Sequence, residues 1–175
     1  MDKKNNSQKI QKRREAREFA FKLIYESNVQ KDKDIAELIA DTEMANEYDA
    51  DENAAKYVKD TLVGVTQKRE EIDVIISENA KGWKLNRISA TSGAILRLAI
   101  YEMLYTTVPF IVAINEAVEL AKKYDHDKAP AFINGILNAV AEQKGLKPSK
   151  AAKKESPASE TAPETEPKTE ETAND

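Results

Sequence analysis

Residues 93–105 read GAILRLAIYEMLY, and apolar side chains occupy nearly every position around this stretch. A helix that is apolar on all sides lies at the centre of a bundle, where neighbouring helices cover each face. The dipeptide Val108-Pro109 follows and ends the helix, because proline lacks a backbone N–H and clashes with the preceding turn. We therefore expect a central helix here, with other helices packed around it.

Apolar residues also recur at helical spacing on both sides of this stretch. The first helix is predicted from about Gln8 to Asn28, and the last has Pro130 in its first turn and ends near Gly145. The apolar stripes are Ala16, Phe19, Ala20, Leu23 and Ile24; Ile35, Leu38 and Ile39; Ala54, Val58, Thr61, Leu62 and Val65, which continues after Arg69 as Ile72, Ile75 and Ile76; Ile111, Ile114, Ala117, Val118 and Ala121; and Phe132, Ile133, Ile136, Leu137 and Val140. No strand-like alternation appears. The predicted fold class is all-α, with about six or seven helices around one extended core or in two small bundles.

The last 30 residues differ in composition from the rest. They hold four of the six prolines, many Ala, Ser, Thr and Glu residues, and no aromatic or β-branched apolar side chain. Such a segment cannot bury enough apolar surface to offset the entropy lost on ordering. We expect a flexible basic N-terminus at 1–10, one domain at 11–145, and a disordered low-complexity tail at 146–175.

Composition excludes several kinds of site. The chain has no cysteine and one histidine, His126, which excludes disulfides, thiolate metal sites and histidine pairs. Five scattered glycines cannot form a phosphate-binding loop. No apolar run approaches the roughly 20 residues of a membrane helix, and the N-terminus has no apolar signal segment. We expect a soluble cytoplasmic protein with no catalytic residue, metal, cofactor or membrane contact.

Charge is distributed unevenly along the chain. The formal net charge is −4, yet residues 1–17 hold seven basic side chains against Asp2 and Glu15. A basic segment on an acidic protein indicates one local anionic partner rather than general coating of nucleic acid. Arginine suits RNA, because its planar guanidinium pairs with phosphate and stacks on bases. From charge alone, the alternative to RNA binding is that these basic side chains simply face solvent at the end of a helix.

Three stretches in order resemble the NusB family. They are RREAREFAFKLIY at 13–25, AILRLAIYE at 94–102, and VP at 108–109 followed by AINEAVELAK at 113–122 and FINGIL at 132–137. Trp83 and Arg87 fall where the family often has a tryptophan and an arginine. The resemblance covers about 11–142 and implies a NusB-like helical bundle.

The resemblance also implies a function. NusB proteins pair with NusE, a ribosomal small-subunit protein, and the pair binds single-stranded boxA RNA in the leaders of ribosomal RNA operons. With RNA polymerase and other factors, that complex suppresses premature termination. The resemblance thus implies a transcription antitermination factor, and 11–145 becomes a NusB-like RNA- and protein-binding domain.

The resemblance assigns RNA binding to residues at two places in the sequence. They are the cluster Lys12, Arg13, Arg14 and Arg17, and the residues Phe132 and Asn134. Phe132 is expected to stack on a base and Asn134 to bond a base edge. The alternative for Phe132 is a core aromatic, because it shares a stripe with Ile136.

The partner site is less clear, because Ser92 and Gly93 stand where the family usually has an acidic–basic pair near its NusE contact. Arg97 and Glu102 lie in the apolar stretch and are expected to be paired, because isolated buried charges are costly. Two alternative functions stay open: a protein adaptor without an RNA role, and a relative of the helical domain of ribosomal RNA cytosine methyltransferases. A homodimer through the partner face also stays open.

Overall fold

The structure is a computed structural model that describes residues 2–29, 52–80 and 87–147. Within these ranges there are six helices and no strand, which confirms the all-α prediction. They are α1 (Asp2–Val29), α4 (Glu52–Gln67), α5 (Arg69–Asn79), α6 (Ala90–Tyr105), α7 (Phe110–Tyr124) and α8 (Ala129–Gln143). The stripe at 35–39, Trp83 and the tail from 148 onward lie outside the described residues.

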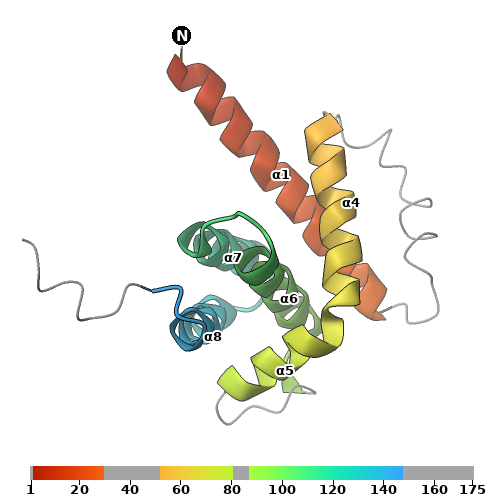
Figure 1. Cartoon of the computed structure of the whole chain (residues 1–175), viewed down its shortest axis with the longest axis vertical. Helices are drawn as coiled ribbons and strands as arrows, with labels where there is room; N and C mark the ends of the chain where they lie inside the picture. Colours follow the sequence, from red (N-terminus) through yellow and green to blue (C-terminus); the bar gives the residue numbers. More distant parts are fainter. Residues whose placement is uncertain (1, 30–51, 81–86, 148–175) are drawn as a thin grey trace, which may run out of the picture.

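Helix α6 is the centre of the bundle, as the apolar stretch predicts. It contacts α1, α4, α5, α7 and α8. Its residues Leu96 and Ile100 are fully buried, and a single apolar core extends from α1 to α8. Helices α1 and α4 pack together on one side of α6, and α7 and α8 pack together on the other (Figure 1).

The contact between α4 and α6 is close because of a glycine. A β-carbon at Gly64 would lie 2.1 Å from the hydroxyl oxygen of Tyr101. A larger side chain there would require the Tyr101 ring to shift, so Gly64 lets that ring lie directly against the α4 backbone. This contact fixes α4 beside the carboxyl half of α6.

Two boundaries differ from the prediction. Helix α1 begins at Asp2 rather than near Gln8, so most of the segment 1–10 has a helical backbone; its flexibility stays a prediction. The apolar stripe that starts at Ala54 is interrupted at Lys68, which separates α4 from α5. Both differences concern polar residues, whose spacing carries little signal for helix ends.

Candidate nucleic-acid interface

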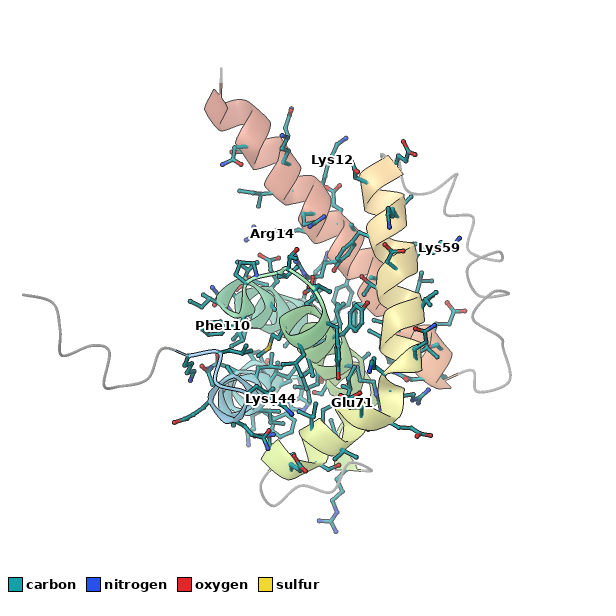
Figure 2. All side chains as sticks on the ribbon, viewed as in Figure 1. Lys12, Arg14, Lys59, Glu71, Phe110 and Lys144 are labelled. Atoms are coloured by element: carbon teal, nitrogen blue, oxygen red, sulfur yellow. The ribbon has the colours of Figure 1, made fainter. Side chains whose placement is uncertain are left out.

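The basic cluster of α1 is divided over different surroundings rather than gathered on one face. Lys12 and Arg13 line a groove beside α4, whereas Arg14 lines a hollow beside α7. Arg17 is buried between them and is 4% exposed. The division follows from helix geometry, because successive residues of an α-helix point about 100° apart. Figure 2 labels Lys12 and Arg14 on this helix.

Arg17 forms a buried ion pair with Glu102 of α6. Its Nε donates to Oε2 at 2.9 Å and its Nη2 donates to Oε1 at 3.0 Å. Burial acts to lower the pKa of Arg17, but the charge and hydrogen bonds of Glu102 outweigh it and the pKa is raised. The prediction that Glu102 pairs with a neighbouring helix is confirmed. Burial of Arg17 does not support its predicted contact with RNA and instead indicates a structural role.

Tyr57 of α4 joins this pair to the groove. Its hydroxyl donates to Oε1 of Glu102 at 2.7 Å, and the guanidinium carbon of Arg13 lies 5.1 Å from the centre of its ring. Burial and the nearby Glu102 carboxylate raise the pKa of Tyr57, so the hydroxyl remains a donor. Tyr57 therefore contacts both an internal carboxylate and an arginine on the surface.

Arg14 is an exposed arginine beside α7. Its side chain is 53% exposed, and its Nε donates to Glu116 at 2.9 Å. The same carboxylate lies 3.5 Å from Nη1 of Arg17. Glu116 thus holds Arg14 at the junction of α1 and α7.

The carboxyl half of α7 is attached to α1 by a second set of polar contacts. Lys123 donates to Glu18 at 2.7 Å, and the Tyr124 hydroxyl donates to the same carboxylate. The rings of Phe21 and Tyr124 are 5.2 Å apart. Between Arg14 and these contacts lies a hollow of about 290 Å³, whose lining includes Lys122 and Lys123.

Phe132 and Asn134 lie near the start of α8, which follows directly after α7. Phe132 is half-buried against the core, and Asn134 is exposed, with its side-chain oxygen accepting from Asn138 at 3.0 Å. The adjacent Gly135 is exposed, and a β-carbon there would meet nothing within 4 Å among the described residues. Gly135 therefore makes no close packing contact with the described residues.

Ser92 and Gly93, predicted at a partner contact, are buried instead. Ser92 is 2% exposed, its N–H donates to the Ser89 hydroxyl at 2.9 Å, and its own hydroxyl donates to Asp125 at 2.5 Å. A β-carbon at Gly93 would lie 3.3 Å from Arg97, which pairs with Asp73 at 2.7 Å. These contacts do not support the predicted partner contact and indicate that the two residues pack the start of α6.

Comparison with known proteins decides the family. The sequence model of the NusB family matches residues 14–142, about three quarters of the chain. The chain belongs to the NusB family. Transcription antitermination protein NusB of Acetivibrio thermocellus is 51% identical over 133 residues, which cover 75% of this chain and 90% of that protein. The protein of the same name in Ruminiclostridium cellulolyticum is 42% identical over 133 residues, covering 74% and 88%.

Solved NusB structures share the fold. T. maritima NusB superposes with a TM-score of 0.69 at 30% identity, covering 77% of this chain and 95% of that one. A structure of the antitermination factors NusB and NusE in complex with double-stranded RNA gives a TM-score of 0.68 at 25% identity, covering 76% and 98%. The predicted NusB-like fold is confirmed.

Sequence reasoning missed two residues of this candidate interface, Tyr57 and Glu116. Tyr57 lies under Arg13, and Glu116 holds Arg14, although each is more than 40 residues from its partner in the chain. For Arg17 the sequence does contain a signal. Glu102 is an acid in the most apolar helix, which indicates that a cation is buried beside it. Across the described ranges, no helix is long and apolar enough to cross a membrane, and no three acidic or histidine side chains gather as metal ligands.

Proposed function

We propose that this NusB-family protein acts in transcription antitermination by binding boxA single-stranded RNA of ribosomal RNA leaders, together with NusE and in a complex with RNA polymerase. Its relatives carry the name transcription antitermination protein. The observation that carries the RNA part is Arg14, a 53% exposed arginine at the junction of α1 and α7. Transcription places this activity in the bacterial cytoplasm.

The proposed RNA surface follows α7. Arg14 contacts Glu116 in the first half of that helix, and Tyr124 is its last residue, about 12 Å further along at 1.5 Å per residue. Helix α8, with Phe132 and Asn134, begins just beyond this end. In an RNA strand that runs along α7, phosphates would contact the Arg14 guanidinium. Bases further along would then contact the Phe132 ring and the Asn134 amide.

The family structure with NusE and double-stranded RNA supports both partners for this chain. The single-stranded boxA target rests on the family resemblance, and it agrees with the presence of an aromatic side chain and an amide side chain near the start of α8, since both kinds of group recognise unpaired bases. Since Ser92 and Gly93 are buried, the proposed NusE contact uses exposed residues around the start of α6, such as Ala90. Lys12 and Arg13 extend the RNA surface to the other side of α1.

A double variant tests the proposal. Arg13→Ala with Arg14→Ala should weaken binding of labelled boxA RNA at least about tenfold and lower the slope of log affinity against log salt by about 0.7 per lost phosphate contact. NusE binding should stay within twofold, and circular dichroism should show the wild-type helix content. Lys59→Ala on the outer side of α4 (Figure 2) is the control that removes a charge elsewhere. Unchanged RNA binding by the folded double variant would contradict the proposal.

A further inference from the structure

A groove of about 810 Å³ lies on the opposite side of α1 from Arg14. Helices α1 and α4 form its walls, and the carboxyl end of α6 closes it. The side chains that matter here are Lys9, Lys12 and Arg13 of α1, Lys56 of α4, and Tyr101 and Tyr105 of α6. We call it the α1–α4 groove. Of the residues that line this groove, the proposed RNA surface includes only Lys12 and Arg13.

The charge of the groove is opposite to that of the chain. Four cationic side chains line it, whereas Asp60 is the one carboxylate among its described lining residues. Asp60 pairs with Lys56 at 2.5 Å, so the positive excess resides on α1. On a protein with a net charge of −4, such a concentration of cations favours an anionic ligand.

Aromatic rings line the same groove. Tyr101 and Tyr105 stack one turn apart on α6, with their ring centres 5.7 Å apart. Arg13 lies over the ring of Tyr57 at 5.1 Å, which holds its guanidinium plane beside the groove. Aromatic rings and guanidinium planes are the surfaces on which unpaired bases stack. An acidic peptide would use the cations but not the rings, so the combination favours nucleic acid.

We infer that the α1–α4 groove binds a second segment of the same single-stranded RNA, next to the segment that lies along α7. This inference rests on the proposed function. Arg13 lines both the groove and a hollow at the start of α7, and Arg14 follows it in sequence, so a strand crossing α1 passes from one binding surface to the other. Helix α1 with its side chains is about 10–12 Å wide, which a few nucleotides can span.

Three RNAs and two matched variants test the inference. The RNAs are boxA alone, boxA with about eight unstructured nucleotides added on its 5′ side, and boxA with the same number added on its 3′ side, because a strand makes several contacts with such a groove. The variants are Lys56→Glu, within the groove, and Lys59→Glu, which makes the same charge change on α4 outside the groove. Titrations of the unaltered protein and both variants with NusE at fixed salt, with circular dichroism as the folding check, give three affinities for each RNA.

One of the extended RNAs should bind the unaltered protein at least about fivefold more tightly than boxA alone. Lys56→Glu should remove that gain without altering the affinity for boxA alone, and Lys59→Glu should retain it. A 4-thiouridine in the extension should crosslink to peptides containing 53–61 or 101–108. Tyr105→Leu should reduce the gain without the change in salt slope that Lys56→Glu produces.

Several results would overturn the inference. If neither extension increases affinity, or if the two lysine variants have equal effects, the groove does not bind RNA, while boxA binding keeps the proposed function intact. If a synthetic peptide of residues 155–175 binds in a Lys56-dependent manner and extended RNA does not, the ligand is an acidic peptide. If the unaltered protein binds none of these RNAs, the proposed function is refuted as well.

Discussion

Arg17 of α1 and Glu102 of α6 form an ion pair in the interior, with side chains that are 4% and 1% exposed. Tyr57 donates a further hydrogen bond to the same carboxylate, and Glu116 approaches Arg17 from α7. The pair thus connects the helix that carries the basic cluster to the helix at the centre of the bundle. The arginines that surround Arg17 in sequence are positioned by residues in contact with this pair.

Breaking the buried pair should destabilise the fold. Arg17→Met leaves the Glu102 carboxylate buried without its cation, and a loss of about 3–5 kcal/mol in the free energy of unfolding is expected. Arg14→Ala, which removes an exposed arginine, should cost at most about 1 kcal/mol. Urea denaturation followed by circular dichroism measures both. Equal small losses for the two variants would show that the buried pair contributes little.

Gly64 and Gly135 should respond in opposite ways to alanine. Gly64→Ala places a methyl group 2.1 Å from the Tyr101 hydroxyl, and the overpacking should cost about 1–3 kcal/mol. Gly135→Ala meets no described atom within 4 Å and should stabilise α8 by up to about 1 kcal/mol through helix propensity. Thermal melts of the two variants compare these effects. A neutral Gly64→Ala would mean that the Tyr101 ring moves aside freely.

Neutralising Glu116 should strengthen RNA binding. Its carboxylate competes with phosphate for Arg14, and an ion pair of this exposure is worth about 0.2–1 kcal/mol, so Glu116→Gln should raise RNA affinity up to about fivefold. Glu78→Gln on α5 makes the same charge change away from the RNA surface and should have a smaller effect. Fluorescence titration at fixed salt provides the measurement. Weaker binding by Glu116→Gln would instead show that Glu116 orients Arg14 for RNA.

Acid should weaken the junction of α6 and α7 through Asp125. Burial acts to raise the pKa of Asp125, but hydrogen bonds from Ser92, the His126 N–H and Ser89 outweigh it and hold the pKa below the ordinary 3.8. A carboxyl with a lowered folded-state pKa contributes stability above 3.8 that is lost as the pH falls through the folded value. Urea midpoints between pH 5 and pH 2.5 should therefore fall more steeply for the unaltered protein than for Asp125→Asn. Parallel curves would rule out this contribution.

The sequence was sufficient for the fold but not for the division of the basic cluster. Apolar spacing predicts α6 and its neighbouring helices because each buried position requires only an apolar side chain, and the sequence shows such side chains directly. The surroundings of Arg14 and Arg17 depend on α6 and α7, which are distant in sequence. The acid Glu102 indicates that some cation must be buried, but it does not identify which one. The partner contact at Ser92 rests on the family resemblance alone, and the small size of its side chain suits an interior position.

In the proposed function, the protein binds boxA RNA specifically, and NusE increases that affinity. The most direct measurement titrates labelled boxA RNA and a scrambled RNA of equal length into the unaltered protein, with and without NusE, at one salt concentration. We predict at least about tenfold tighter binding of boxA than of the scrambled RNA, or about 1.4 kcal/mol, and a further gain with NusE. Equal affinity for both RNAs, unchanged by NusE, would contradict the claim.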